Sequence, residues 1–332
     1  MTPKERVMNR LEGKPVDKIP NFNIVMLFAA KHAGVQYGDF CFDYRKLVEA
    51  QYKTAVDFGI DILSTMSDPY RETHDYGVPI KRVEDDLPVC EGILIGDIDE
   101  MDKVKLWDPM TSTRMLDRIL AVELFKKNYG DEYPILGWVE GPMAEFTDLA
   151  TISEGMYMMF DEPDKVKEVM AVITQQAIRC ALAQLEAGAD FIGIGDAAAS
   201  LISNEQYREF VMPLEAKIVE AVHKAGGKTK LHICGNINHI LESMIETGSD
   251  VIDIDYMVDF ETAIQLAGGK CSISGNLDPV EVILQSSVKS IREKTRFCME
   301  KGGARSMFSG GCEVPKMTPP ENLKAMDDEL RS

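Results

Sequence analysis

The feature that most constrains the fold is a regular alternation of short apolar, β-branched runs with longer amphipathic stretches. Eight runs are candidate strands: 19–24, 61–65, 133–140, 190–196, 228–234, 251–255, 271–276 and 306–312. The amphipathic stretches between them include 42–57, 162–187, 203–224, 236–247 and 278–301. Strands that alternate with helices indicate βα units and a parallel sheet. Eight such units predict an α/β fold, a closed (β/α)8 TIM barrel with its helices outside.

The domain organisation follows from this count. We expect one barrel domain over residues 1–332, since α/β barrels exceed the usual domain size. An N-terminal helix is predicted over 2–13, because a capping box runs from Thr2 to Glu5. The region 66–110 fits no βα unit and predicts an inserted hairpin or lid after the second strand. A doubly wound sheet is the competing fold, but no G-x-G-x-x-G motif follows the first run.

Charge and cysteine usage narrow the classes of function. A formal net charge of −19 argues against nucleic acid and against an anionic membrane surface, both of which attract basic proteins. No run of about 18 apolar residues predicts a membrane span, and the charged N-terminal segment does not resemble a signal peptide. Seven scattered cysteines suit a reducing compartment better than a disulfide framework. The expected location is therefore the cytoplasm.

The chemistry-bearing residues gather at the ends of the predicted strands. In an α/β barrel the active site lies at the carboxyl ends of the strands. The residues at these ends are Glu140, Asp196, His232, Cys234, Asp253, Asp255, Asn276, Cys312 and Glu313.

His232 and Cys234 are two positions apart, so on a strand both side chains point to one face. Cys312 follows Gly310-Gly311 at the end of the last strand and should return to the same rim. One imidazole and two thiolates form a soft ligand set that suits zinc, and three protein ligands mark a catalytic site. We therefore predict His232, Cys234 and Cys312 as catalytic zinc ligands, with Asp255 as a displaceable fourth. The alternative is ordinary core packing of the histidine and the cysteines.

A zinc ion with two thiolate ligands favours one kind of chemistry. A bound metal deprotonates a coordinated thiol outright, whereas thiolate ligands weaken the metal as a Lewis acid towards water. Electron donation by the ligands should also keep the bound sulfur nucleophilic. The ligand set therefore favours thiol alkylation over hydrolysis.

Several long motifs carry a family resemblance. The opening "TPKERVMNRLEGKPVDKIP" and the segments "EAGADFIGIGDAAASLISNEQYREFVMPLEAKIVEAVHKAGGKTKLHICGN", "DVIDIDYMVD" and "ISGNLDPVEVI" resemble the uroporphyrinogen decarboxylase superfamily over nearly the whole chain. That resemblance implies a (β/α)8 barrel.

Within this superfamily, "LHICGN" and the distant "GGC" resemble the zinc-dependent methylcobamide:coenzyme M methyltransferases. The resemblance implies that His232, Cys234 and Cys312 bind zinc. It also implies that a thiol takes a methyl group from a methyl-Co(III) corrinoid on a small separate protein. Cobalamin-independent methionine synthases use a similar His, Cys, acidic residue and Cys arrangement, which is why Asp255 is named.

One departure separates the chain from the true decarboxylases. Those enzymes carry an arginine-rich segment near the first strand, but here the segment "NFNIVMLFAAKHAGVQYG" has no arginine. Asp68 could match their essential aspartate. An aspartate without its arginines, in an acidic chain, is poorly suited to a substrate with many carboxylates. The departure argues against porphyrinogen decarboxylation.

For each remaining candidate residue, a structural role is the alternative to a functional role. Glu140, Asp196 and Asn276 would orient substrate or the ligands, or simply form hydrogen bonds at the barrel mouth. His74, with Asp75, lies in the predicted lid and would touch substrate.

His239 is predicted to be a solvated helix residue. Cysteines 41, 90, 180 and 298 are expected to be structural, and Cys271 begins its strand and should lie at the opposite end of the barrel.

The sequence leaves the methyl acceptor and donor open. The same scaffold could pass the methyl group to tetrahydrofolate, or take it from a methoxylated or methylamine donor. A sulfonate-bearing thiol such as coenzyme M needs basic groups, for which Lys316 and Arg71 are the candidates. A lyase of the uroporphyrinogen decarboxylase type is the alternative from another reaction class. A corrinoid or tetrapyrrole chaperone without enzymatic activity is the third reading.

Overall fold

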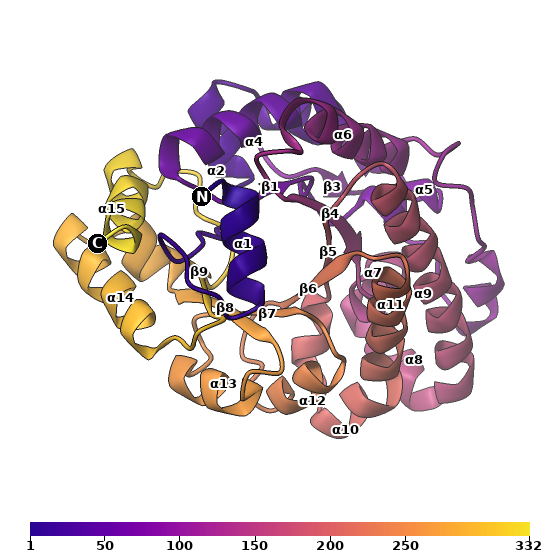
Figure 1. The fold of residues 1–332 in the computed structure, drawn as a ribbon. Helices are drawn as coiled ribbons and strands as arrows, with labels where there is room; N and C mark the ends of the chain where they lie inside the picture. The colour runs from indigo at the N-terminus through magenta and orange to yellow at the C-terminus, as the bar shows by residue number, and fades with distance from the viewer.

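A computed structural model describes residues 1–332. Seven parallel strands form a curled sheet with helices around its outside (Figure 1). The strands, in their order across the sheet, are β1 (Leu63–Ser64), β4 (Ile135–Glu140), β5 (Phe191–Gly195), β6 (Lys228–Ile233), β7 (Val251–Ile254), β8 (Ser272–Leu277) and β9 (Met307–Gly310). The α/β class and the barrel-like architecture predicted from the sequence are confirmed.

The predicted strand 19–24 is not a strand, and this part of the prediction was wrong. The segment forms a single parallel bridge, between Asn21 and Phe308 of β9. On its other side, the amide of Asp61, just before β1, donates to the carbonyl of Asn21 (2.8 Å). The segment therefore fills the gap between the two edge strands without a regular ladder. Pro20 has no N–H to donate, which shortens any ladder at this point.

The helices pack around the sheet and enclose one large apolar core. They are α1 (Pro3–Leu11), α2 (Leu27–Ala33), α3 (Tyr37–Phe42), α4 (Tyr44–Phe58), α5 (Arg71–Asp75), α6 (Arg114–Tyr129), α7 (Pro142–Ala150), α8 (Ile152–Asp161), α9 (Pro163–Glu186), α10 (Asn204–Gln206), α11 (Met212–Lys224), α12 (Leu241–Glu246), α13 (Phe260–Ala267), α14 (Val288–Lys301) and α15 (Pro320–Leu330). Two 3-10 segments, η1 (Ile98–Lys103) and η2 (Ala197–Leu201), and two π segments, η3 (Tyr207–Val211) and η4 (Pro279–Leu284), complete the chain. None of these helices combines the length and the apolar character needed to cross a membrane.

Helix α1 lies across the amino-terminal end of the barrel (Figure 1). The predicted capping box is present, since Thr2 and Glu5 exchange hydrogen bonds. Lys4 pairs with Asp190 before β5 (2.7 Å), and Arg6 pairs with Asp61 before β1 (2.5 Å). These contacts close the end of the barrel that faces away from the strand carboxyl ends.

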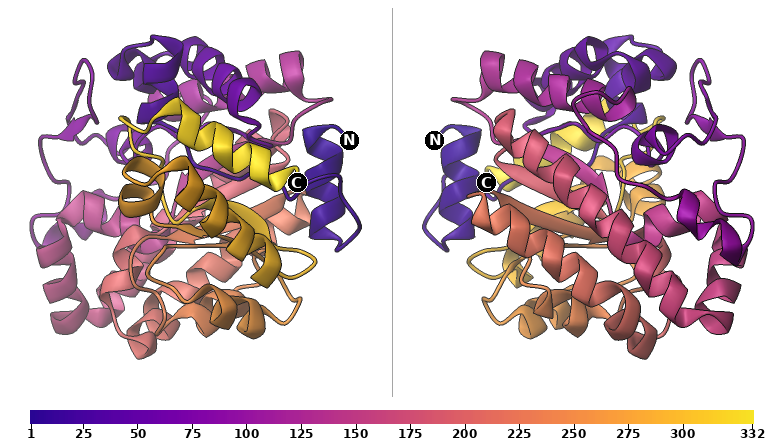
Figure 2. Two further views of the ribbon diagram at one scale, coloured as in Figure 1. Left: turned by 90° about the vertical axis from the view of Figure 1, so that its left-hand side faces the viewer. Right: turned by 90° about the vertical axis from the view of Figure 1, so that its right-hand side faces the viewer.

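The region 66–110 contains a small hairpin, as predicted. Strands β2 (Ile80–Lys81) and β3 (Val89–Cys90) pair in antiparallel fashion. Leu87, between them, lines the cavity at the carboxyl ends of the barrel strands. Figure 2 shows the purple loops of this insertion on the side of the molecule opposite the indigo α1.

Two predicted helices are interrupted. The stretch 203–224 divides into α10, η3 and α11, and 278–301 divides into η4 and α14. Pro213 lacks the N–H that a continuous α-helix would use, and Ser287 caps a new helix by accepting from the amide of Ser290. In 236–247 only α12 is α-helical, because the side chain of Asn236 accepts from the amide of Asn238 and forms a turn.

Candidate metal centre at the barrel mouth

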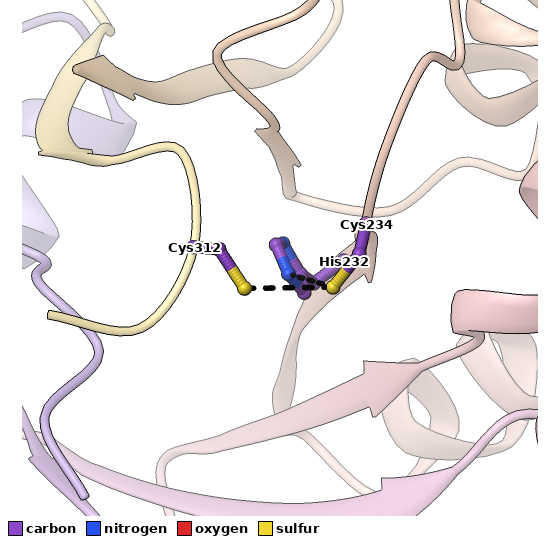
Figure 3. A group of neighbouring side chains, drawn as sticks. All are labelled: His232, Cys234 and Cys312. Atoms are coloured by element: carbon purple, nitrogen blue, oxygen red, sulfur yellow. Dashed lines mark hydrogen bonds between the residues drawn. The ribbon is translucent and has the colours of Figure 1, made fainter. Parts of the chain in front are cut away.

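One histidine and two cysteines meet at the carboxyl end of the sheet (Figure 3). His232 is in β6, Cys234 follows that strand, and Cys312 follows β9. Nε2 of His232 lies 3.0 Å from Sγ of Cys234, which lies 3.6 Å from Sγ of Cys312. The three ligand atoms all lie within 4.8 Å of one another. The topology thus brings together residues 78 positions apart in the chain.

Two glycines explain why the chain turns in this way. Gly235 has a positive φ of 89°, which L-residues rarely adopt, and its amide donates to Oδ2 of Asp255 (2.7 Å). Gly311 passes so close to the backbone of Tyr256 that any Cβ would collide with it. The loops after β6, β7 and β9 are therefore pressed together, which brings the two thiols into contact.

A buried ion pair orients His232. Nδ1 lies 3.0 Å from Oδ2 of Asp253, which is its partner in the ladder between β6 and β7. Because a carboxylate only accepts hydrogen bonds, Nδ1 must be the donor, and Nε2 is left to face the thiols. Lys230 donates to the same carboxylate (2.6 Å), and Ser309 donates to its other oxygen (3.2 Å). Sequence reasoning did not assign a role to Lys230 or Asp253.

Two of the three candidate ligands, Cys234 and His232, hold protons that a bound cation would have to displace. A hydrogen bond from Cys234, opposed by burial and aided by His232, lowers the pKa of Cys312 to about 4. Hydrogen bonding to that thiolate, together with burial, raises the pKa of Cys234. Burial alone would lower the pKa of His232, but Cys234 and Asp253 raise it well above its usual value. Metal binding displaces such protons, so affinity for a cation should rise with pH.

The donor set fits zinc. Zinc ligands at the usual bond lengths in a tetrahedron place two sulfurs about 3.8 Å apart and a nitrogen and a sulfur roughly 3.5 Å apart. The observed sulfur–sulfur separation of 3.6 Å is close to the first value, and the nitrogen–sulfur separation of 3.0 Å is shorter than the second, as expected for two atoms in a direct hydrogen bond. Asp255 lies outside the group of three, but its Oδ1 is buried and has no hydrogen-bond partner. Asp255 as a fourth ligand therefore stays a prediction.

A cavity of about 220 Å³ opens directly over these residues. Its walls include Ile24, Met26, Met66 and Trp138, and also Glu140, Asp196 and Asp68, three acids selected from the sequence. Sequence reasoning overlooked Trp138, whose indole N–H donates to Oε1 of Glu140 (2.9 Å).

Trp138 lies on β4 opposite Gly193 of β5, and Glu140 lies opposite Gly195. Only a residue without a side chain leaves room for the indole ring, because a Cβ on Gly193 would collide with it. The signal in the sequence was the alternation of glycines in "FIGIG".

We expect Gly193→Ala to lower the free energy of unfolding by about 1–3 kcal/mol, because the indole must shift when an atom is added to a packed wall. Urea unfolding measures this loss. Gly303→Ala is the matched control, since its Cβ would meet only an ordinary contact, 3.8 Å from Ile264. Equal stability of the two variants would contradict the role given to Gly193.

Asp68 does have arginines, which corrects the sequence-based description. Arg114 of α6 donates to both oxygens of Asp68 (2.8 Å each), and Arg71 lies 4.0 Å from it. These arginines come from helices rather than from the segment near the first strand. Both are buried, with Arg71 fully inaccessible, so they neutralise Asp68 instead of facing a substrate.

Three other candidates, His74, Asp75 and Asn276, do not line the cavity. His74 pairs with Asp75 (2.9 Å), and Asp75 accepts hydrogen bonds from the first amides of α6. The amide of Asn276 donates to the carbonyls of Asp255 and Val258.

His239 is exposed but lies in a turn before α12, where its Nε2 is 2.8 Å from the carbonyl of Ile202. Cysteines 41, 180 and 298 are buried in helices, while Cys90 is half-buried in β3. Cys271 lies beside Gly13 and Arg305, at the end of the barrel that α1 covers.

Several buried carboxyl groups hold their protons unusually well. Burial is the main cause, and it raises the pKa of Asp148 to about 7 and that of Asp196 to about 6. It also raises the pKa values of Glu145 and Glu215 well above the usual range. The folded chain therefore keeps protons that the unfolded chain releases above about pH 4.

This arrangement predicts that stability falls as pH rises. The contribution of these groups is fully present below about pH 4 and is lost as pH rises through 6 to 7, at roughly 1.4 kcal/mol per pH unit for each group that is protonated in the folded chain and ionised in the unfolded chain. Asp68 and Asp253, whose pKa values are lowered, contribute constantly across this window. Urea unfolding of chelator-treated protein at pH 5 and 7.5 tests this, and Asp148→Asn should reduce the difference. Higher stability at pH 7.5 would contradict the assignment.

The match to a known family covers almost the whole chain. The sequence profile of the uroporphyrinogen decarboxylase (URO-D) family matches residues 2–332, so the chain belongs to this family.

Relatives within the family point to two activities. The chain is 28% identical to the methylcobamide:CoM methyltransferase MtbA of Methanosarcina mazei, over 98% of this chain and 96% of the relative. It is 26% identical to the uroporphyrinogen decarboxylase of Carboxydothermus hydrogenoformans, over 83% of this chain and 80% of the relative. A solved structure of a methyltransferase from Methanosarcina mazei superposes with a TM-score of 0.91 at 23% identity, covering 99% of this chain and 98% of that one. This likeness supports the fold.

Proposed function

We propose that the protein is a zinc-dependent methyltransferase that moves a methyl group between a corrinoid carried by a small partner protein and a small thiol. The observation that carries this proposal is the convergence of His232, Cys234 and Cys312 at the cavity. Soft nitrogen and sulfur donors are the ligands that zinc prefers. The similarity to MtbA supports the same reaction class.

Each part of the site has a task in this proposal. His232, Cys234 and Cys312 would hold the zinc, and Asp253 keeps the imidazole turned towards it. Zinc, when bound there, lowers the pKa of the acceptor thiol so that the thiol reacts as a thiolate. The apolar wall around Trp138, Met26 and Met66 excludes water from the sulfur. Holding the sulfur in one place turns the encounter with the methyl donor into a positioned reaction.

The transfer step balances without a further reactant. The thiol releases its proton to solvent, and its sulfur gives an electron pair to the methyl carbon. The carbon–cobalt bond of the methyl-Co(III) corrinoid breaks, and its electron pair stays on cobalt, which becomes Co(I). The products are a thioether and the reduced corrinoid.

The size of the cavity supports a small acceptor. Pockets for drug-sized ligands measure roughly 300–1,000 Å³, whereas this cavity has about 220 Å³. A thiol of a few heavy atoms fits such a space better than tetrahydrofolate does. The corrinoid would remain bound to its partner protein and would sit at the mouth of the cavity.

The test is a direct comparison of the two reaction classes. Purified zinc-loaded protein is mixed with methylcobalamin and 2-mercaptoethanol, and separately with uroporphyrinogen. The proposal expects S-methyl product and Co(I) absorbance in the first mixture and no carbon dioxide release in the second. The lyase is the second candidate, because Asp68 lines the cavity and decarboxylases are among the relatives. Decarboxylation without methyl transfer would establish the lyase instead.

A further inference from the structure

Carboxyl groups line the cavity over the candidate metal centre, and burial raises the pKa of Glu140 well above its usual range and that of Glu313 to about 7. Four carboxyl groups and no lysine or arginine line this cavity: Asp68, Glu140, Asp196 and Glu313. Asp68 is neutralised by Arg114, and Asp196 accepts from the backbone amide of Ala144 (2.6 Å). Of the three acids without a cationic partner, Asp196 accepts two backbone hydrogen bonds, which leaves two acids that accept only one hydrogen bond each beside the space where the acceptor would sit.

Glu140 and Glu313 are these two acids. Oε1 of Glu140 accepts from Trp138, while its Oε2 has no hydrogen-bond partner. Oε1 of Glu313 accepts from the backbone amide of Leu27 (2.6 Å). Neither carboxyl group forms an ion pair with a lysine or an arginine, and the cavity wall contains neither residue type.

Three basic residues, Arg71, Lys316 and Arg82, each pair with an aspartate. Arg71 donates to Asp117 (2.9 Å) and is fully buried. Lys316 pairs with Asp85 (2.8 Å), and Arg82 pairs with Asp39. Neither of the two residues considered for holding a sulfonate, Arg71 and Lys316, lines the cavity.

We propose that the acceptor is an aminothiol, whose tail carries a protonated amine, and that the cavity disfavours thiols with an anionic tail. The inference rests on the proposed function and narrows its acceptor. An ammonium group can donate to Glu140 and favours the ionised form of its carboxyl group, whereas a sulfonate would lose water without gaining a cation. Two thiolate ligands also balance the charge of a bound zinc ion, so the centre offers no net attraction to an anion.

Three thiols with the same two-carbon scaffold test this directly. They are cysteamine, 2-mercaptoethanol and 2-mercaptoethanesulfonate (coenzyme M), which differ in the charge of the tail. We expect kcat/KM for methyl transfer from methylcobalamin, corrected for thiolate fraction, to be at least about tenfold higher for cysteamine than for coenzyme M. 2-Mercaptoethanol should lie between them. Equal values, or a preference for coenzyme M, would overturn the inference.

Calorimetric binding of the same thiols to zinc-loaded protein separates this inference from the proposed function. Tighter binding of cysteamine with no transfer to any thiol would contradict the proposed function and show only that the cavity prefers a cationic tail, whereas equal binding of the three thiols would overturn the inference. The variant Glu140→Gln should narrow the difference in Kd between cysteamine and 2-mercaptoethanol, while Glu220→Gln should preserve it. Glu220 is the charge control because it is exposed on α11, where it pairs only with Lys224. An unchanged difference in Kd between the two thiols in Glu140→Gln would show that Glu140 does not bind the tail of the thiol.

Discussion

Replacement of Cys312 by alanine should abolish both zinc binding and methyl transfer. The thiol of Cys312 contacts that of Cys234 at 3.6 Å, and without it only two of the three proposed ligands remain. We expect zinc content to fall from about one per chain to below about a tenth, and the rate to fall by at least about a thousandfold, since both the metal and the positioned sulfur are lost. Elemental analysis and an assay of S-methyl product measure the two effects.

Cys90→Ala is the matched control for this experiment. Cys90 is a half-buried thiol in β3, and its sulfur contacts the carbonyl of Gly92 (3.2 Å) rather than the candidate ligands. The Cys90→Ala protein should retain both zinc and methyl-transfer activity. A Cys312→Ala protein that keeps one zinc per chain would show that zinc is bound at another site.

Replacement of Asp253 by asparagine should weaken both the fold and the metal site. The substitution leaves the ammonium group of Lys230 buried without its charged partner, which costs about 3–5 kcal/mol. It also weakens the hydrogen bond that orients His232, and loss of such a partner lowers metal affinity by about 10–100-fold. Urea unfolding and zinc competition against a chromophoric chelator measure the two effects separately.

A double variant separates the two effects. Lys230→Met combined with Asp253→Asn removes the whole ion pair, and a buried pair replaced in this way is often neutral for stability. The double variant should therefore recover most of the lost stability and keep the reduced zinc affinity. If zinc affinity also returned to that of the wild type, Asp253 would have no role in orienting His232.

The alternation of strands and helices predicted most of the fold, because each strand was a short apolar run bounded by turn residues. It failed at 19–24, where Pro20 and two buried asparagines connect the edge strands through one bridge and side-chain hydrogen bonds. It also did not reveal the π segment before Pro213. The first feature depends on contacts with distant residues, which local pattern does not encode, whereas the second lies directly before Pro213 in the chain.

The part of the site that depends on the two-residue side-chain period of a strand, and on the position of residues at strand ends, was predictable. The two-residue spacing of His232 and Cys234, and the rule that strand ends share one rim, indicated that the three candidate ligands would meet. What remained hidden depends on strand register: Asp253 faces His232, and Gly193 faces Trp138. The pairing of Asp68 with Arg114 was also hidden, because it depends on where a helix 46 residues later in the chain packs.

The most direct test of the central claim is the rate of methyl transfer as a function of bound zinc. Zinc is removed with a chelator under conditions that protect thiols, and is then returned in measured amounts before methylcobalamin and a thiol are added. We expect no S-methyl product from the zinc-free protein and a rate that rises in proportion to zinc until about one ion per chain is bound. A rate that does not depend on zinc would contradict the account and return His232, Cys234 and Cys312 to core packing.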